Sequence, residues 1–574
     1  MSTCKGGVCH LVKSNKNKTA KRKTSKQKKP KQRITRIRSC SAGVSIASNS
    51  RLEPRLEEEP QNQINSTEET ASWFHRPFDG IGNNLNNPLW GSANTALLRM
   101  SPYEPFESRT TNPRIISNIV CSKPESSPNL RGVTDMFWGW GQFIDHLLDL
   151  TPDDDTMTAP IIAPPDDPVM PNGVISFKKS RKMPNSSLEN PNTISSYIDG
   201  TNVYGTESER IYSLRRLDGT GKLKTQMYLN SIDEHELLPA NATGLPNAEL
   251  TRNMGQSEEM FLAGDIRANE NVLLTSLHTL FVLEHNRQCD EILTANPQWS
   301  GNESRLFAEA RKRVVAHMQA ITYQEFIPLL LGSDAMPPYT GYNPDVNAGI
   351  NQEFSACAYR LGHSMVSGNL QIGTDDEGMV MNLVDVFFNP DWLKEHGIKG
   401  VLEGAAAKEM QQINTMIVPE LRSFLFGPHA PGMFLDLAAL NIQRGRDHGL
   451  TDYNSMRVAY GLPRLSTFDQ ITIDSDIASR LSQAYNADID IIDPWIGGLA
   501  EDHVGGGQVG PLFRAIILDT FTRLRDGDRY YYETDTTMTP HEIRDIKRTT
   551  LGDLISRNCP TADVSSNVFV RNRG

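Results

Sequence analysis

The sequence predicts a mainly α-helical protein: a single large helical domain with few short strands over residues 71–574, preceded by a disordered basic arm over residues 1–70. Three long stretches repeat apolar residues with helical spacing, whereas the alternating patterns of strands are few. The length alone would allow roughly three or four ordinary domains. No long linker and no internal repeat follows Trp73 and Phe74, which favours one domain.

The N-terminal arm is rich in lysine and polar residues and poor in aromatic ones. Residues 1–38 carry 14 Lys and Arg and no Asp or Glu, which leaves a net charge of −25 on the rest of the chain. Such a segment cannot bury enough apolar surface to offset its ordering entropy, so we expect disorder. We interpret it as a solvated tail. A nucleic-acid, anionic-membrane or targeting role is the alternative, and no specific nucleic-acid partner is expected.

The three helical patterns follow in order, over residues 134–150, 269–293 and 304–331. In the second pattern Leu273, Leu277, Leu280 and Phe281 recur with helical spacing. Proline-rich stretches such as residues 156–173 predict loops. A mostly helical domain with loops of this length usually encloses a bound ligand. The pattern therefore favours a large buried cofactor.

Composition excludes two classes of protein. The apolar run from Leu273 to Leu283 is shorter than the roughly 20 residues that a membrane span needs, so no transmembrane segment is expected. Three of the seven cysteines lie in the arm, and the four others are too few for a disulfide scaffold. Cys4, Cys9 and His10 lack the second ligand pair of a zinc site. Lysines recur near the first residue, so no secretory signal peptide is evident.

The first group of candidate functional residues lies in WGWGQFIDHLLDLTP, residues 138–152. Gln142 and His146 are four residues apart, so both project from one face of a helix. Asp145 precedes the histidine and Asp149 follows it. A histidine with these neighbours can act as a proton shuttle. The alternative is a buried histidine that only bonds to a carboxylate.

Three further groups follow along the chain. In DIRANEN, Arg267 and Glu270 are three residues apart, and the alternative is a surface ion pair. In AYRLGHSM, His363 could bind a metal through one ring nitrogen if an acceptor holds the other N–H. In DLAALNIQRGRDHGLTDYN, Asn441 could be that acceptor, and Arg444 could pair with a cofactor carboxylate.

Taken together, the residues and the order of five sequence motifs resemble those of the animal haem peroxidase family. The motifs are WGQFIDH, SSYIDGTNVYG, DIRANE with LHTLFVLEHNR, YRLGHS and LNIQRGRDHGL. The resemblance covers residues 73 to about 560, and the scarcity of cysteines is similar to the bacterial and invertebrate members. It implies a helical haem peroxidase fold and a secreted or extracellular location.

The resemblance also implies roles for the residues that carry it. The cofactor would be haem b, with His363 as the iron ligand and Asn441 accepting its second N–H. On the opposite face His146 would be the distal histidine, Arg267 the distal arginine and Gln142 the residue that contacts halide or water. His146 would move a proton between the oxygens of peroxide, and Arg267 would stabilise the charge that develops as they separate.

The resemblance also implies which residues lie at the edge of the haem. Arg360 and Arg444 would lie near the propionates. Asp145 and Glu270 match the acids that form ester bonds to haem methyl groups in many members. Asn271 stands where one member has a methionine linked to haem, so at most these two ester links are expected.

A calcium site is implied by the loop SSYIDGT, residues 195–201. Ser195, Tyr197, Asp199 and Thr201 would supply two hydroxyls, a backbone carbonyl and a carboxylate. Leu147 stands where the family often has a further aspartate, and the loss of one ligand lowers the expected affinity. The alternative is a loop closed by hydrogen bonds alone.

The implied activity is reduction of hydrogen peroxide and oxidation of halides or small phenolic donors through an oxoferryl haem. One alternative is a haem fatty-acid oxygenase, whose radical tyrosine lies three residues before the proximal histidine. That position is Arg360 here. Tyr359 is one residue away, and a step of one residue on a helix turns a side chain by about 100°, away from the substrate channel. The other alternative is an adhesion protein that retains the fold.

Overall fold

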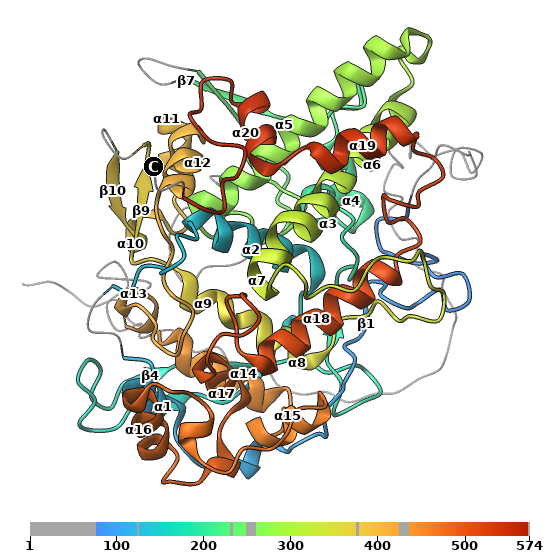
Figure 1. The fold of residues 1–574 in the computed structure, drawn as a ribbon. Helices are drawn as coiled ribbons and strands as arrows, with labels where there is room; N and C mark the ends of the chain where they lie inside the picture. Colours follow the sequence, from blue (N-terminus) through green and yellow to red (C-terminus); the bar gives the residue numbers. More distant parts are fainter. Residues whose placement is uncertain are drawn as a thin grey trace, which may run out of the picture. The chain divides into compact units, whose positions relative to one another are not determined.

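The computed structural model describes residues 76–122, 126–229, 234–247, 260–374, 378–423 and 435–571. The arm predicted over residues 1–70 and the Cys4, Cys9 and His10 group lie outside these ranges. Helices dominate the described chain and its strands are short, which confirms the fold class (Figure 1). In the described ranges no helix is both long and apolar enough to cross a bilayer.

The α-helices are, in chain order, α1 (Pro113–Val120), α2 (Asp135–Leu148), α3 (Thr201–Tyr204), α4 (Ser208–Leu214), α5 (Val272–Ala295), α6 (Glu303–Ile321), α7 (Ile327–Leu331), α8 (Gln352–Ser355), α9 (Gly362–Met365), α10 (Leu383–Val386), α11 (Pro390–His396), α12 (Lys399–Ala407), α13 (Pro419–Arg422), α14 (Leu437–Asp447), α15 (Tyr453–Ala459), α16 (Ser475–Ala484), α17 (Pro494–Ala500), α18 (Pro511–Asp526), α19 (Pro540–Arg548) and α20 (Leu551–Asn558). Short 3₁₀ segments are η1 (Phe106–Ser108), η3 (Pro297–Trp299), η5 (Ala358–Leu361), η6 (Phe468–Gln470) and η7 (Ile489–Ile491).

The described strands form antiparallel pairs rather than a central sheet. The pairs are β1 (Thr95–Ala96) with β6 (Pro191–Asn192), β2 (Asp153–Thr158) with β5 (Lys178–Ser180), β3 (Ile161–Ile162) with β4 (Val174–Ile175), β7 (Gln226–Leu229) with β8 (Glu234–Leu237), and β9 (Asn369–Ile372) with β10 (Met379–Asn382). The proline-rich stretch 156–173 is therefore a loop that carries short strands.

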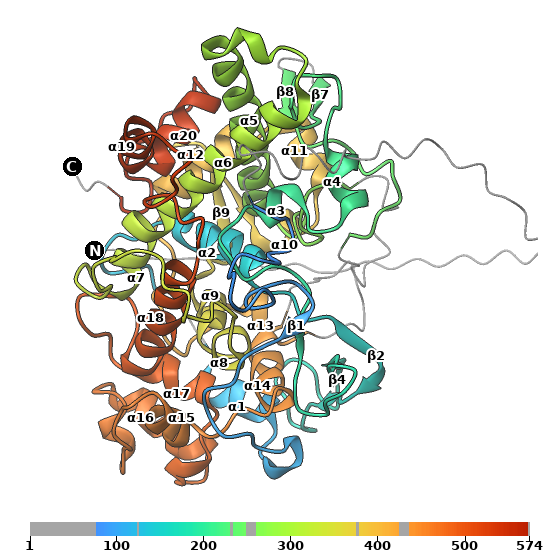
Figure 2. The ribbon, with the colours of Figure 1, turned by 90° about the vertical axis from the view of Figure 1, so that its right-hand side faces the viewer.

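Helix α2 lies at the centre of the described domain. Helices α5, α6 and α12 lie on one side of it, and α8, α9 and α14 lie on the other (Figures 1 and 2). Gly139 lets α2 approach α5 closely, because a β-carbon there would come within 2.7 Å of the Leu273 side chain. Trp140 and Phe143 pack on Phe281 of α5, with ring centroids 5.7 and 5.0 Å apart. This packing fixes the face of α2 that turns toward α9.

The third predicted helix is continuous in space but changes its winding. Helix α6 passes into a π-helical turn, η4 (Thr322–Phe326), and then into α7. Pro328 is the second residue after the turn. Its ring crowds the preceding turn and it has no N–H to donate, so regular α-helical bonding cannot run through this point. Single π-helical turns inside helices are often found at functional sites.

The second predicted helix begins three residues later than expected. The Asn271 side chain accepts a hydrogen bond from the Leu274 N–H at 2.9 Å and so caps α5, which starts at Val272. The residues before this cap therefore belong to a loop. Arg267 and Glu270 are presented from that loop and not from a helical face.

All four cysteines in the described ranges, Cys121, Cys289, Cys357 and Cys559, are free thiols. The core is therefore held by packing and by buried polar contacts. One such contact ties α1 to α14, because Arg114 donates to Asp436 at 2.6 Å and Asp436 caps α14.

Candidate active site

The face of α2 that turns toward α9 carries the first predicted group. Gln142, Asp145 and His146 all line one cavity, as their spacing predicted. His146 lies in the last turn of α2 and is 4% exposed. Its Nδ1 has no hydrogen-bond partner among the described residues. Gln142 accepts a hydrogen bond from Asn271 at 2.9 Å, which fixes its amide beside the α5 cap.

Arg267 reaches the same cavity region from the loop before α5. Its Nε donates to Oδ1 of Asp265 at 2.9 Å, and its Nη2 donates to Oδ2 at 2.8 Å. Nη2 also lies 3.3 Å from the His146 carbonyl oxygen. The guanidinium is thus held by a two-point contact beside His146. Such forked pairs give orientation as well as energy.

Asp265 is the residue in this region that the sequence interpretation did not assign. Its Oδ1 lies 3.7 Å from Nδ1 of His146, beyond a normal direct hydrogen bond. Burial alone would raise the pKa of Asp265, but the adjacent Arg267 outweighs this and holds the pKa at about 2. Asp265 is therefore a permanent negative charge between Arg267 and His146. The only indication in the sequence was its place in the DIRANEN block.

His146 is neutral at physiological pH in this environment. Burial, and next the positive charge of Arg267, lower the pKa of His146 well below 6.5. A neutral imidazole has one nitrogen free to accept a proton. The structure thus supplies a base whose ring is fixed in the helix and whose charge is suppressed by its surroundings.

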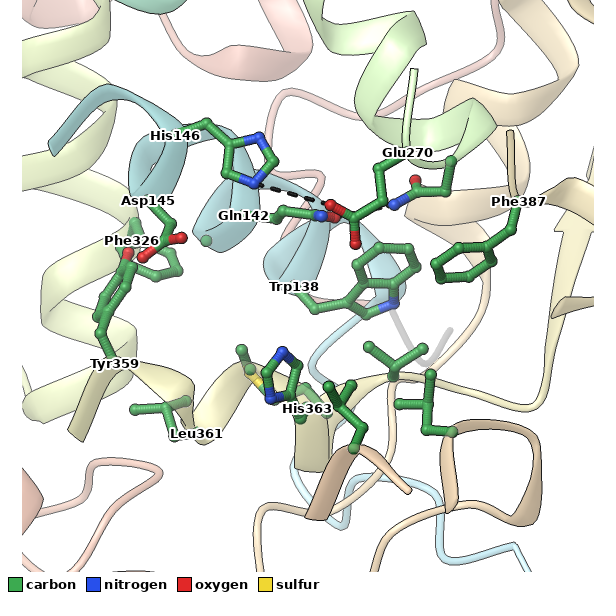
Figure 3. A pocket seen from close by; sticks show the side chains of 17 residues that line it. Trp138, Gln142, Asp145, His146, Glu270, Phe326, Tyr359, Leu361, His363 and Phe387 are labelled. Carbon is green, nitrogen blue, oxygen red and sulfur yellow. Dashed lines mark hydrogen bonds and ion pairs between the residues drawn. The ribbon is translucent and has the colours of Figure 1, made fainter. Parts of the chain in front are cut away.

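Two carboxyl groups share the cavity with His146. Glu270 Oε2 lies 3.9 Å from His146 Nε2, the contact drawn in Figure 3. Burial raises the pKa of Glu270 to about 7, although Arg267 opposes the shift. Burial and the neighbouring Asp149 carboxylate raise the pKa of Asp145. Both predicted ester-forming acids therefore line the cavity and are less acidic than in water.

The segment that carries His363 lies across the cavity from α2. It runs through η5 into α9, where His363 faces the space below His146 and Gln142 (Figure 3). Nδ1 of His363 lies 2.7 Å from the Asn441 amide nitrogen, and Asn441 is fully buried on α14. Burial, and next the charge of Arg360, lower the pKa of His363 to about 3. His363 and Asn441 are thus in contact, as predicted.

The Asn441 amide is turned the other way from the prediction. Its nitrogen faces His363, and its oxygen lies 3.4 Å from Nη1 of Arg360. The two arrangements differ by a half-turn of the amide, which exchanges a donor for an acceptor. The amide nitrogen is a donor, so Nδ1 must accept the hydrogen bond. The single ring proton of a neutral His363 therefore resides on Nε2.

Between the two histidines lies an enclosed space. It measures about 920 Å³ when the open space at its mouth is included. Its walls are largely apolar, with contributions from Trp138, Phe326, Leu361, Met365 and Phe387. An adjoining space of about 800 Å³ shares part of this wall and adds Arg267, Arg360 and Arg444.

The residues present fit a haem group. A porphyrin has a flat apolar ring, a metal ion at its centre and two carboxylates at one edge. The cavity offers apolar walls, an imidazole on each side, and the guanidinium groups of Arg360 and Arg444 in the adjoining space. Arg444 also contacts Asp153 and Asp447, at 3.0 and 3.2 Å.

Tyr359 also lines this cavity, contrary to the spacing argument. Residues Ala358–Leu361 form a 3₁₀ helix and not the regular α-helix on which that spacing depends, so successive side chains are rotated differently. The Tyr359 hydroxyl is buried and has no hydrogen-bond partner among the described residues.

The predicted calcium loop is compact and buried. Asp199 is fully buried, and its Oδ1 accepts from the hydroxyl and from the N–H of Thr201. Its Oδ2 has no partner within the described chain. Burial raises the pKa of Asp199, although Arg76 and Arg311 oppose the shift. No group of three or more His, Cys, Asp or Glu side chains suited to a metal occurs among the described residues, so such a site would depend on hydroxyls and carbonyls.

Comparison with known proteins identifies the chain's relatives. The model of the animal haem peroxidase family matches residues 75–569. Peroxinectin A from Dictyostelium discoideum is 34% identical over 525 residues, which cover 86% of this chain and 95% of that protein.

The solved structures agree with this relationship. Peroxidase A from Dictyostelium discoideum superposes with a TM-score of 0.79 at 33% identity and covers 87% of this chain and 99% of its own. Fatty acid alpha-dioxygenase from Arabidopsis thaliana shares the fold at 19% identity, with a TM-score of 0.72 over 86% of this chain and 83% of its own. By sequence and by fold, this chain is a haem-dependent peroxidase that belongs to the animal haem peroxidase family.

Proposed function

We propose that this peroxidase binds haem b between His146 and His363, reduces hydrogen peroxide there, and oxidises halides or small phenols. The observation that carries the assignment is the position of the two imidazoles on opposite walls of one largely apolar cavity. When bound, haem supplies the iron that passes electrons from the donor to peroxide. Every other role falls to residues of the chain.

His146 is proposed as the acid and base. It is neutral because burial lowers its pKa, so Nε2 can take a proton from hydrogen peroxide as it enters. The same nitrogen then returns the proton to the oxygen that leaves as water. Gln142, one turn earlier on α2, is proposed to position the incoming peroxide or halide.

Arg267 is proposed to stabilise the negative charge that develops as the oxygen–oxygen bond breaks. Its orientation is set by the forked contact with Asp265, so no side-chain ordering is needed during the reaction. Asp265 is a positioning residue in this scheme, since it acts through Arg267 and His146.

His363 is proposed as the iron ligand. Binding through Nε2 requires the proton to reside on Nδ1, so Asn441 must present its amide oxygen to that N–H. The amide is buried at hydrogen-bond distance, and a half-turn supplies the required acceptor. Arg360 and Arg444 are proposed to pair with the haem carboxylates from the adjoining space.

Two finer features are proposed from the described contacts. Asp145 and Glu270 are proposed to form ester bonds to haem methyl groups, because both line the cavity. In each bond a carboxyl oxygen would replace one methyl hydrogen, and one hydrogen peroxide, reduced to two waters, would take the two electrons. The loop of Ser195, Tyr197, Asp199 and Thr201 is proposed to bind calcium, supported by the unpartnered Oδ2 of Asp199. It offers four oxygens against the roughly six to eight that calcium prefers, so water would complete the shell.

The experiment that tests the proposal is an absorption spectrum of the purified protein and of two variants, with and without peroxide. We expect a haem Soret band that changes on adding peroxide. His363→Ala should lose haem or alter the band. His146→Ala should keep haem and react with peroxide about 10²–10⁴-fold more slowly, the contribution of a positioned acid–base group. An unchanged spectrum in His363→Ala, or full reactivity in His146→Ala, would remove the assignment.

A fatty-acid oxygenase is the second candidate, because Tyr359 reaches the cavity with an unpartnered hydroxyl. Oxygen uptake with an unsaturated fatty acid distinguishes the two activities. Uptake that is lost in Tyr359→Phe would support the oxygenase, and no uptake beside rapid phenol oxidation would exclude it.

A further inference from the structure

A continuous series of aromatic rings leads from the cavity to the surface of the protein. It runs through Tyr359, Phe521, Tyr323, Tyr531 and Tyr339. The successive ring centroids lie 5.9, 6.2, 5.6 and 4.7 Å apart. All four separations fall in the roughly 4.5–7 Å range of interacting aromatic pairs. These rings come from η5, α18, η4 and two loops, so the series is a tertiary feature.

The inner end of the series opens on the haem cavity. Tyr359 lines both the main cavity and the adjoining space, and it is labelled in Figure 3. Phe354 stacks on its ring at 4.5 Å and holds it in place. The hydroxyl has no partner among the described residues, which is costly for a buried phenol unless the group has a function or a missing partner.

The middle of the series passes through an irregular piece of helix. Tyr323 lies in the π-helical turn η4, whose last residue, Phe326, lines the cavity. The Tyr323 hydroxyl donates to the Phe521 carbonyl at 2.9 Å, which fixes the phenol beside α18. The extra residue of a π-turn changes the direction of the side chains that follow it. Because of this turn, η4 can place Phe326 in the cavity wall and Tyr323 in the ring series.

The outer end is a half-buried tyrosine held in a defined position. Tyr339 has exposed prolines, Pro337 and Pro338, immediately before it. Its hydroxyl bonds to Thr534 at 2.9 Å, and the Arg525 guanidinium lies over its ring at 5.2 Å. Tyr531, the ring before it, is 2% exposed. The series therefore meets solvent at Tyr339.

We propose that this ring series carries electrons from phenol groups on macromolecules, such as tyrosine side chains of another protein, to the haem. The inference rests on the proposed function, because the haem cavity must supply the oxidant. A macromolecule cannot enter a cavity enclosed by Trp138, Phe326 and Phe387, whereas a surface tyrosine is open to it. Electrons move far more readily between rings in contact than across saturated chain, and phenols give up electrons more easily than benzene rings. Phe521 therefore bridges Tyr359 and Tyr323 without being oxidised.

The electron and proton balance is that of the peroxidase reaction. Two donor phenols each lose one electron and one proton and become phenoxyl radicals. The two electrons and two protons convert one hydrogen peroxide to two waters. For each donor phenol oxidised, each tyrosine of the series loses and regains one electron, so none is changed at the end. Two phenoxyl radicals can then couple through a new bond between their rings.

The test compares a large and a small donor on the haem-loaded full chain. The large donor is a soluble lysine–tyrosine copolymer, whose positive charge suits the acidic body of the protein, and the small donor is a simple phenol. Tyr339→Phe keeps the ring but removes the oxidisable phenol. Tyr103→Phe is the matched control, since Tyr103 is half-buried and takes no part in the series.

We expect Tyr339→Phe to lower copolymer oxidation about tenfold or more while simple-phenol oxidation stays within about twofold of the original. Tyr103→Phe should change neither. A second reading is independent of turnover: a radical trap added with peroxide alone should label Tyr339, as located by peptide mass spectrometry. Tyr323→Phe, which interrupts the series internally, should remove that label.

Four outcomes would overturn the proposal. Copolymer oxidation that is unchanged in both Tyr339→Phe and Tyr323→Phe excludes the series as the route. A trap label that avoids Tyr339 in the original protein also excludes it. If the original protein oxidises neither donor, the proposed function itself fails and the inference fails with it. Oxidation of the simple phenol alone leaves the proposed function standing and rejects only the series.

Discussion

Asp265 holds the Arg267 guanidinium by two parallel hydrogen bonds, 2.9 Å to Nε and 2.8 Å to Nη2, while its Oδ1 lies 3.7 Å from Nδ1 of His146. One carboxylate thus faces both groups that are proposed to act on peroxide. Because Arg267 holds the Asp265 pKa at about 2, this charge is present at every pH at which the enzyme would work.

Asp265→Asn should therefore slow the reaction with peroxide without releasing haem. The amide keeps the size of the side chain but can no longer accept both guanidinium bonds, so Arg267 loses its fixed orientation. We expect a loss of about 10²–10³ in the rate constant, similar to removing one oriented charge-stabilising group. Stopped-flow absorption of the Soret band after mixing with peroxide measures it.

The matched control for this variant is Asp154→Asn, at a half-buried position on β2 whose carboxylate accepts from Thr156 and which lines neither space of the site. The control should react like the original protein. A rate for Asp265→Asn equal to that of the control would show that Arg267 keeps its place without the carboxylate.

The pH dependence follows from the lowered pKa of His146. The base form is required to take the proton from peroxide, and it is lost only when the pH falls below the pKa of the folded protein. Burial and Arg267 place that pKa well below 6.5, so the peroxide rate should stay level as the pH falls from about 8 to about 6. Measuring kcat/KM for peroxide over this range tests it. A decline with a midpoint close to 6.5 would mean that His146 is solvated or is not the base.

The sequence predicted the helices and the composition of the site better than it predicted their local geometry. Gln142 and His146 share a face because the i, i+4 rule holds inside a regular helix. The same kind of rule failed at Tyr359, where the backbone is a 3₁₀ helix, and at Arg267 and Glu270, which precede the cap made by Asn271. The secondary-structure propensity of the sequence does not predict this 3₁₀ helix or this loop, because tertiary packing determines both.

Asp265 shows a second reason why part of the site escaped prediction. An aspartate two residues before an arginine is common on surfaces, so its sequence context carries little information. Its role emerges only when α2 brings His146 within 4 Å of it. The contact between His363 and Asn441 could be predicted as a pair, but the orientation of the amide depends on the position of Arg360, which the amide oxygen faces at 3.4 Å.

Replacement of Asn441 tests the proximal assignment. Asn441→Asp places a carboxylate beside Nδ1 of His363, which draws the N–H proton and increases the electron density on the ring. We expect the haem reduction potential to become more negative, since the partner of the axial ligand tunes the iron. Spectroelectrochemical titration measures this shift, which a purely structural role would not produce.

A variant that removes the amide gives the complementary result. Asn441→Leu leaves Nδ1 without a partner and should weaken haem binding about 10–100-fold, the usual cost of losing such a contact. Potentials that are equal in the original protein and Asn441→Asp, with unchanged haem affinity in Asn441→Leu, would contradict the assignment of His363 as the iron ligand.

Calcium should stabilise the protein if the loop around Asp199 binds it. A ligand that binds only the folded state adds about 2.7 kcal/mol when its concentration is 100 times its Kd. The melting temperature should therefore rise with added calcium and fall with a chelator. Asp199→Asn removes the single carboxylate of the loop and should abolish both responses. The amide can still accept the Thr201 hydrogen bonds, so the loop should keep its shape.

Asp154→Asn again serves as the control, and a calcium response that persists in Asp199→Asn would place the ion elsewhere. A melting temperature insensitive to calcium in the original protein would show that Leu147, the residue at the family's usual aspartate position, leaves too few oxygens and that hydrogen bonds alone close the loop.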